Sequence, residues 1–195
     1  MASRKKRKFP LGIGDTLLSE ERFRMLDPRE VVDAFGIGEG HIVLDVGCGP
    51  GAFLEALSFR VGRDGSVFAI DIQEPFVNMA RKLAEEKSLR NIAFVVSRED
   101  SIPIEDGIAD AALMITTLHE LDGNGTLREA RRILKRNGSL GIVEWEKTKT
   151  PVGPPISERI AQEESEEFLS LNGFEVEKAF AIGKYHYGIS ARRGR

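Results

Sequence analysis

The chain has 195 residues, of which 30% are charged, and its formal net charge is −3. This length suits one domain with a core of its own, and the slightly acidic balance does not support a nucleic-acid-binding protein. There is no apolar run near the roughly 20 residues of a membrane-spanning helix, and none follows the basic start as in a secretory signal. We therefore expect a cytoplasmic protein. The single cysteine, Cys48, excludes an intrachain disulfide and argues against a cysteine-based zinc site.

Residues 1–27 are expected to form a basic arm and an N-terminal cap segment. Positions 4–8 are all lysine or arginine. Such a block of like charge repels itself and stays solvated, although it also suits contact with RNA or an anionic membrane. Residues 19–26 predict a short helix. Asp27 and Pro28 then predict the start of the next helix, with the Asp27 side chain as its cap.

Residues 28–195 are expected to form a single α/β domain. Short apolar runs alternate with amphipathic stretches, which is typical of a parallel sheet covered by helices on both faces. Apolar residues fall on one helical face in 76–83 and again in 127–134. About one residue, Gly183, separates the last two strands, so they must form an antiparallel hairpin. The sequence thus predicts a seven-stranded, mostly parallel sheet with an antiparallel last strand. The expected strands are 42–46, 66–72, 92–97, 110–116, 139–145, 174–182 and 184–191.

The most informative stretch is the glycine turn that follows the first of these strands. Gly47, Gly49 and Gly51 allow the backbone to turn sharply and to approach a ligand closely. Asp45 precedes the turn by two residues, where it would repel a dinucleotide's phosphates and favour a ligand with an ammonium or sulfonium group. Asp71, at the end of the second strand, suits a ribose diol or, alternatively, a helix cap. The glycine spacing disfavours a nicotinamide-dependent oxidoreductase.

These residues resemble the class I S-adenosylmethionine-dependent methyltransferases, in which Asp-Val-Gly-Cys-Gly-Pro-Gly, here residues 45–51, is the first motif. The resemblance extends from about residue 31 to the C-terminus. It includes Asp110 at the start of strand four, Leu-His-Glu-Leu at 118–121 and Arg-Ile-Leu-Lys-Arg-Asn-Gly at 132–138. It is closest to the small-molecule, type 11 branch, which is similar to the quinone-biosynthesis enzymes. The resemblance implies a Rossmann-like fold, S-adenosylmethionine as cofactor and in-line methyl transfer to an unidentified small-molecule acceptor.

The resemblance also implies individual contacts with the cofactor. Gly47, Cys48 and Gly49 would meet its methionine portion, Asp71 would bind both ribose hydroxyls, and Ile72 would pack on adenine. The order of elements places these residues at the carboxyl ends of neighbouring strands, where ligands bind in open α/β sheets.

The chain departs from the family pattern after strand three. Relatives commonly have Asp-Ala there to recognise adenine, whereas this chain has Arg98, Glu99 and Asp100. Arg98 cannot accept a hydrogen bond from the adenine amino group, so Glu99 or Asp100 substitutes or the contact is absent. No metal site is expected. The expected cofactor residues are Asp45, Gly47, Cys48, Gly49, Asp71, Ile72, Glu99, Asp100 and Thr116.

Strand four should lead past the methyl donor to His119 and Glu120, the candidate catalytic residues. Methyl transfer depends on alignment and desolvation, so a dedicated base is optional. His119 either deprotonates the acceptor or is structural, and the sequence assigns it no orienting partner. Glu120 and Glu144 either bind a cationic acceptor or face solvent. Trp145 either forms a wall of the acceptor pocket or packs beneath the loop 148–155.

Two alternatives to a small-molecule methyltransferase remain open. An RNA methyltransferase is favoured by the basic arm and disfavoured by the acidic balance and by the lack of an Asn/Asp-Pro-Pro-Tyr motif after strand four. A noncatalytic S-adenosylmethionine-binding domain would bind the cofactor without consuming it.

Overall fold

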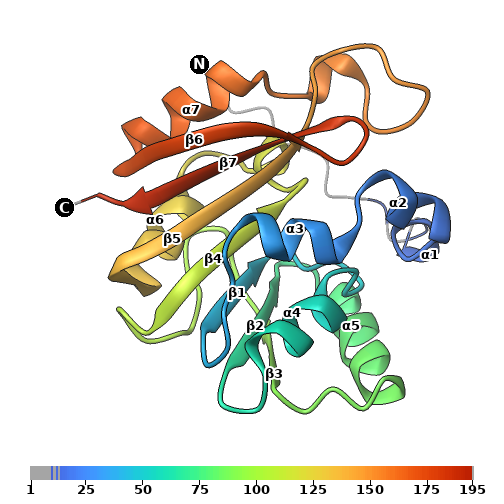
Figure 1. Ribbon diagram of the computed structural model, residues 1–195, viewed down its shortest axis with the longest axis vertical. Coiled ribbons are helices and arrows are strands. Elements are labelled where there is room, and N and C mark those ends of the chain that lie inside the picture. Colours follow the sequence, from blue (N-terminus) through green and yellow to red (C-terminus); the bar gives the residue numbers. More distant parts are fainter. Residues whose placement is uncertain (1–9, 11, 13, 195) are drawn as a thin grey trace.

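The protein is built around a seven-stranded sheet, seen in a computed structural model that describes residues 10, 12 and 14–194. The strand order is β3-β2-β1-β4-β5-β7-β6 (Figure 1). The strands from β3 to β5 pair in parallel, and β7 is antiparallel to both β5 and β6. The predicted fold class is therefore confirmed. The basic block at 4–8 lies outside the described residues, and the division of the chain at residue 28 stays a prediction.

In the part of the chain that the structure describes, three helices precede the first strand, and strands then follow with helices between most of them. Their bounds are α1 (Gly14–Leu17), α2 (Glu20–Met25), α3 (Pro28–Ala34), β1 (Ile42–Val46), α4 (Leu54–Val61), β2 (Ser66–Asp71), α5 (Glu74–Glu86), β3 (Ile92–Val96), β4 (Ala109–Ile115), η2 (Leu118–Glu120), α6 (Gly125–Ile133), β5 (Leu134–Trp145), η3 (Ile156–Glu158), α7 (Gln162–Leu171), β6 (Phe174–Ile182) and β7 (His186–Arg193). None of these helices is long and apolar enough to cross a membrane.

The sheet separates two apolar cores, because successive strand residues point to opposite faces. On β4, Leu113 belongs to the core that contains buried residues of α3, α4 and α5, whereas Met114 belongs to the core with buried residues of α6 and α7. Helices thus cover both faces, as the alternating pattern predicted. Because helices cover both faces of the sheet, a ligand can reach it at the ends of its strands.

Two predicted strand starts were wrong by two or more residues. Strand β5 begins at Leu134 rather than at residue 139, so Leu134 leaves the helical face to which it was assigned. It is fully buried in the strand, and hydrophobicity alone does not distinguish a buried helix end from a buried strand start. The last strand begins at His186 rather than at residue 184, because residues 183–185 form the hairpin turn.

Both helix starts predicted near the N-terminus are confirmed. Ser19 caps α2 by accepting a hydrogen bond from the Arg22 backbone N–H, and Asp27 caps α3 by accepting one from the Arg29 backbone N–H. Pro28 occupies the first turn of α3, where its missing N–H costs no hydrogen bond.

The end of α2 is attached to the turn of the β6–β7 hairpin, far away in the sequence. The Lys184 N–H donates to the Met25 carbonyl oxygen over 2.8 Å. Gly183 has a φ of +58°, and a Cβ atom at this position would lie 2.4 Å from the same oxygen. The close approach of the two segments therefore requires a glycine.

We expect Gly183→Ala to lower the free energy of unfolding by about 3 kcal/mol, from left-handed strain together with the clash against Met25. Gly107→Ala is the matched control, because Gly107 has a φ of +67° and nothing within 4 Å of the new Cβ. It should cost about 1 kcal/mol. Urea denaturation of both variants measures the difference in free energy of unfolding. Equal losses would show that the hairpin turn can shift away from α2 and avoid the clash with Met25.

Candidate functional site

A cavity of about 130 Å³ lies at the carboxyl ends of β1, β2 and β4. Of the residues predicted for the site, it is lined by Gly47, Gly49, Asp71, Ile72, Glu99, Thr116 and Glu120. Four predicted residues do not line it: Asp45, Cys48, Asp100 and His119.

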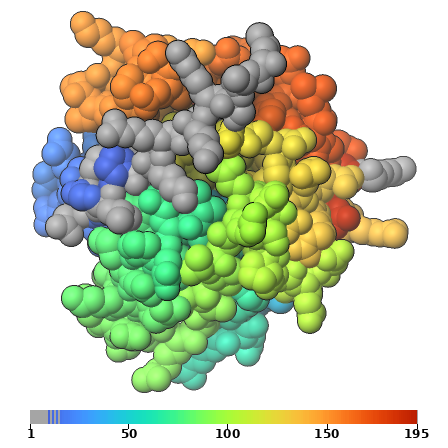
Figure 2. Space-filling model, turned by 180° about the vertical axis from the view of Figure 1, so that it is seen from behind, coloured from blue at the N-terminus to red at the C-terminus, as the bar shows by residue number. Residues whose placement is uncertain are grey.

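Other lining residues were not predicted. Gln73, Ser97 and Thr117 follow the ends of strands, so the strand-end rule would have found them. Leu17 and Thr126 come from helices α1 and α6, and nothing in the sequence marks them as site residues. In Figure 2, the blue N-terminal helices lie between the orange segment after β5 and the green segment around α5. Leu17 of α1 thus forms part of the cavity wall.

The glycine turn is held tightly against β2. The N–H groups of Gly47 and Cys48 both donate to the Ile70 carbonyl oxygen, over 2.8 and 3.0 Å. Gly47 has a φ of +77°, and a Cβ atom there would lie 2.5 Å from the Thr117 side chain. The Thr117 side chain therefore packs directly on the Gly47 backbone, and Gly47 and Gly49 both line the cavity.

Asp71 connects the glycine turn with the start of α5. Its Oδ2 accepts a hydrogen bond from the Gly49 N–H over 3.0 Å, and its Oδ1 accepts one from the Gln73 N–H over 2.8 Å. The second contact closes a turn just ahead of α5, whose N-cap residue is Gln73, so it does not make Asp71 the cap of that helix. The same carboxylate lines the cavity at 8% exposure, so one side chain organises the turn and faces the ligand space.

Asp45 is buried beside the turn, at 2% exposure. Within the described part of the chain, its Oδ2 has no hydrogen-bond partner. Burial and, to a smaller extent, the charge of Asp71 raise the pKa of Asp45 to about 7. Two acidic groups and one orphan acceptor next to a bare backbone turn fit a ligand with a cationic group.

Cys48 is buried within the turn, and its Sγ lies 3.6 Å from the Gly49 carbonyl oxygen. Burial, followed by the charges of Asp45 and Asp71, raises the pKa of the thiol well above its usual value. A thiol held in its neutral form is a poor nucleophile, so this environment gives Cys48 no covalent chemistry.

Thr116 is strained at the far side of the cavity. Its φ is +53°, a conformation that is uncommon outside glycine and concentrates at functional sites. Its N–H donates to the Val143 carbonyl oxygen over 2.7 Å, and its hydroxyl accepts a hydrogen bond from Arg22 Nη2 over 3.2 Å. Neither the strained backbone of Thr116 nor its contact with Arg22 was predictable from sequence patterns.

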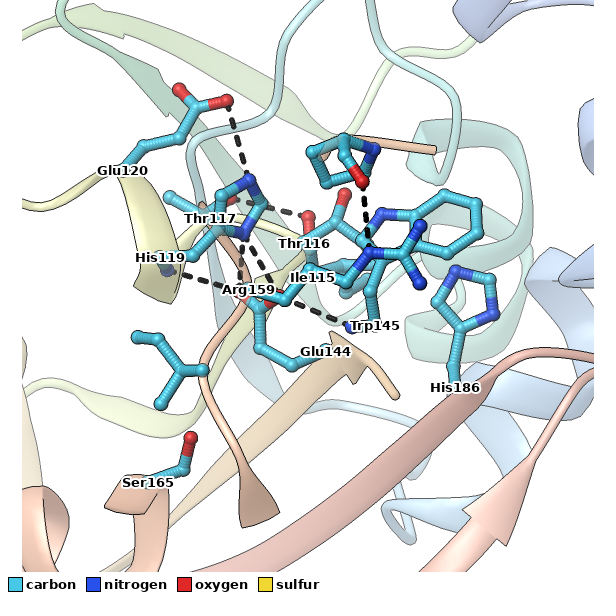
Figure 3. Close-up of polar contacts among 12 residues, drawn as sticks. Ile115, Thr116, Thr117, His119, Glu120, Glu144, Trp145, Arg159, Ser165 and His186 are labelled. Atoms are coloured by element: carbon cyan, nitrogen blue, oxygen red, sulfur yellow. Dashed lines mark hydrogen bonds and ion pairs between the residues drawn. The ribbon is translucent and has the colours of Figure 1, made fainter. Parts of the chain in front are cut away.

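Glu144 is the orienting partner of His119 that the sequence did not assign (Figure 3). His119 Nδ1 lies 3.0 and 2.9 Å from the two Glu144 carboxylate oxygens, and the backbone N–H groups of His119 and Trp145 each donate to Glu144 over 3.2 Å. Glu144 is fully buried and does not face solvent. On the other side of the ring, Nε2 lies 3.8 Å from Glu120 Oε1. A chain of contacts therefore leads from the interior to the cavity.

Trp145 packs beneath the loop 148–155 and does not line the cavity, which confirms the packing alternative. A Cβ atom on Gly153 would lie only 2.9 Å from its ring. The ring centroid is 5.2 Å from the Arg159 guanidinium and 4.1 Å from the His186 ring (Figure 3).

The sheet with its antiparallel β7, the glycine turn after β1 and the acidic residue closing β2 together define the class I S-adenosylmethionine-dependent methyltransferase fold. Residues 44–142 match the family model described as a methyltransferase domain, of type 11. The chain belongs to this family. The predicted family is confirmed, together with the methyltransferase class and the S-adenosylmethionine cofactor that the family implies.

Solved structures and curated proteins agree with this assignment. A SAM dependent methyltransferase from Aquifex aeolicus is 36% identical with a TM-score of 0.93, and the match covers 95% of this chain and 100% of that one. A putative type 11 methyltransferase from Sulfolobus solfataricus is 26% identical with a TM-score of 0.70, over 88% and 94% of the two chains. A ubiquinone/menaquinone biosynthesis C-methyltransferase from Hydrogenovibrio crunogenus is 29% identical over 126 residues, 64% of this chain and 50% of that protein. The chain thus spans about half the length of the curated relatives it matches.

We expect Asp45→Asn to stabilise the protein more at pH 8 than at pH 5. The pKa of Asp45 is 3.8 unperturbed and about 7 in the folded protein, so the folded state retains a proton that the unfolded chain releases between these values. Stability therefore falls as pH rises from about 4 to 7, and asparagine removes this loss. The stability difference should change by roughly 3 kcal/mol from pH 5 to pH 8, at about 1.4 kcal/mol per pKa unit.

Denaturation of the two proteins at several pH values measures this difference. Asp64→Asn, at an exposed position, is the control and should show no such trend. A constant difference between Asp45→Asn and the wild type would contradict the buried, proton-retaining carboxyl.

Proposed function

We propose that the protein transfers a methyl group from S-adenosylmethionine to a small-molecule acceptor within this cavity. One observation carries the proposal: the glycine turn and Asp71 border the same cavity as Thr116 and Glu120. The first pair belongs to the side expected to hold the cofactor, and the second pair follows β4, which leads to the acceptor. Methyl transfer needs donor and acceptor held in line and away from water, and a shared cavity meets that need.

The residues of the cavity fit the parts of the cofactor. Gly47 and Gly49 present bare backbone to the methionine portion, Asp71 offers carboxylate oxygens to the ribose hydroxyls, and Ile72 offers an apolar surface to adenine. Glu99 lines the cavity while Asp100 does not, which makes Glu99 the better candidate for the adenine amino group. When bound, the cofactor supplies an electrophilic methyl group on a sulfonium.

On the acceptor side, His119 and Glu120 serve to remove a proton. The Glu144 carboxylate accepts hydrogen bonds, so His119 carries its proton on Nδ1. Nε2 of the neutral ring, 3.8 Å from Glu120 Oε1, is then the nitrogen that can take up a proton. As the acceptor takes up the methyl group that the bound cofactor would supply, the acceptor's proton would pass to this pair of residues. Glu144 acts as a positioning residue for the imidazole.

A small molecule is the acceptor that the relatives favour. Several curated relatives are named as ubiquinone/menaquinone biosynthesis C-methyltransferases. The cavity lies among side chains of α1, the strand ends and α6 rather than along an open basic groove, which supports a small acceptor over RNA.

Asp71→Ala should weaken binding of S-adenosylhomocysteine by roughly 2–4 kcal/mol, because two ribose hydroxyls lose a charged acceptor. Isothermal titration calorimetry measures the loss. The exposed variant Asp64→Ala should bind as the wild type does. Wild-type affinity in a folded Asp71→Ala protein would remove this carboxylate from the cofactor site.

His119→Ala should lower turnover about 100-fold or more while leaving S-adenosylhomocysteine affinity nearly unchanged, since general-base catalysis contributes about that factor. Turnover is followed as S-adenosylhomocysteine released with an acceptor found by screening. His41→Ala, before β1 at the opposite end of the sheet, is the control. If His119→Ala keeps full turnover, the histidine is structural.

A further inference from the structure

Helix α2 carries a buried cation whose hydrogen-bonding capacity is largely unused. Arg22 is 9% exposed, and arginine is rarely buried unless it is paired. Its guanidinium donates to two neutral groups, Thr116 Oγ1 over 3.2 Å and His186 Nε2 over 3.5 Å. No carboxylate of the described residues forms an ion pair with it. Because a guanidinium has five N–H donors, three have no acceptor in the described part of the protein.

A second arginine in the same surroundings, Arg159, has all of its hydrogen-bond donors engaged. Arg159 is 4% exposed and packs on Trp145, as Arg22 does, with guanidinium-to-ring distances of 5.2 and 5.6 Å. Its donors make five hydrogen bonds, to the carbonyl oxygens of Glu146, Thr148, Val152 and Pro154 and to the Thr150 hydroxyl. Arg159 therefore fastens the loop over Trp145, and a guanidinium so engaged has no donor left for a ligand.

The surroundings of Arg22 do not neutralise it. Glu144 is the carboxylate that acts on it electrostatically, but this group is already bonded to N–H groups of His119 and Trp145. Burial outweighs Glu144 and lowers the pKa of Arg22 to about 10, so the side chain stays charged at neutral pH at a cost in solvation. His186 is neutral there, since burial and the two arginines lower its pKa to about 3.

Arg22 lies behind the acceptor side of the cavity and reaches it through Thr116 without lining it itself. Its partner Thr116 lines the cavity, and so does Leu17, five residues earlier in the chain. Trp145 and His186, its other neighbours, end β5 and begin β7, whereas Asp71 ends β2, on the opposite side of β4 in the sheet. A group held by Arg22 would therefore belong to the molecule that enters past β4 and β5.

We propose that Arg22 binds an oxyanion of the methyl acceptor, a carboxylate or a phosphate, and that the acceptor is an anion. This inference rests on the proposed function, because it concerns the acceptor half of the same cavity. The planar fork of a guanidinium matches two oxygens of such a group, and the pairing would give the unused donors their acceptors.

The test is a comparison of charged and neutral probes. Wild-type protein saturated with S-adenosylhomocysteine is titrated at constant ionic strength with benzoate, phenyl phosphate and benzamide. The fluorescence of Trp145, the only tryptophan in the chain, reports binding beside Arg22. At least one of the two anions should bind about tenfold or more tightly than benzamide, since charge-assisted hydrogen bonds are lost with the neutral amide. If neither anion binds more tightly than benzamide, the proposal is overturned.

Three variants assign the preference to one side chain. Arg22→Gln should abolish it, and Arg22→Lys should retain it at reduced strength. Arg24→Gln is the matched control, because Arg24 lies on the same helix, is exposed and pairs with Glu20. An unchanged preference in folded Arg22→Gln protein would overturn the proposal, as would loss of the preference in Arg24→Gln.

A second titration separates this proposal from the proposed function. S-adenosylhomocysteine is compared with 5′-methylthioadenosine, which lacks the amino-acid carboxylate. If wild-type protein does not bind S-adenosylhomocysteine, the proposed function fails, and the anion comparison without it still tests Arg22. If Arg22→Gln weakens only S-adenosylhomocysteine and leaves benzoate binding intact, Arg22 holds the cofactor's carboxylate and the proposal is overturned.

Discussion

The arrangement of the acceptor side depends on one buried charge. Glu144 is fully buried at the end of β5, where an unpaired carboxylate would cost several kcal/mol. It is satisfied by the ring and backbone of His119 and by the backbone of Trp145. These bonds fix η2 against β5, which places Glu120 at the cavity and turns the Trp145 ring toward the loop that covers it. The burial of this carboxylate thus sets the positions of three neighbouring residues at once.

The cofactor side is organised by a different constraint, which is the close approach of backbone to backbone. The turn after β1 lies against Ile70 of β2, and the Asp71 carboxylate holds both the turn and the start of α5. Because Asp71 lies near Asp45 in a poorly solvated space, its charge adds to burial in raising the pKa of Asp45.

Local features of the fold were predictable from the sequence, and contacts between distant segments were not. The apolar runs, the glycine turn and the capping residues Ser19 and Asp27 act within a few residues, so their patterns are visible in the chain. The partnership of His119 with Glu144 depends instead on the pairing of β4 with β5, which aligns Ile115 with Val143. A glutamate within the apolar run 140–145 was the available signal, since such a residue must find donors when it is buried.

Arg22 was missed for a related reason. Its neighbours Thr116, Trp145 and His186 come from three strands, and a charged residue on a short N-terminal helix looks like an ordinary surface residue in the sequence. The positive φ of Thr116 is equally invisible, because threonine has no preference for that conformation and only the surrounding contacts impose it.

The position of β7 between β5 and β6 affects how the protein can be made. Residues 186–193 occupy an interior position in the sheet, next to its edge strand, although they are synthesised after both strands that they join. Until the ribosome has released them, β5 has an unpaired edge, and such edges favour association with other chains. Late closure by a distant segment also raises the contact order, which slows folding. A nascent or proteolytically clipped chain that ends before residue 186 should therefore depend on chaperones to stay unaggregated.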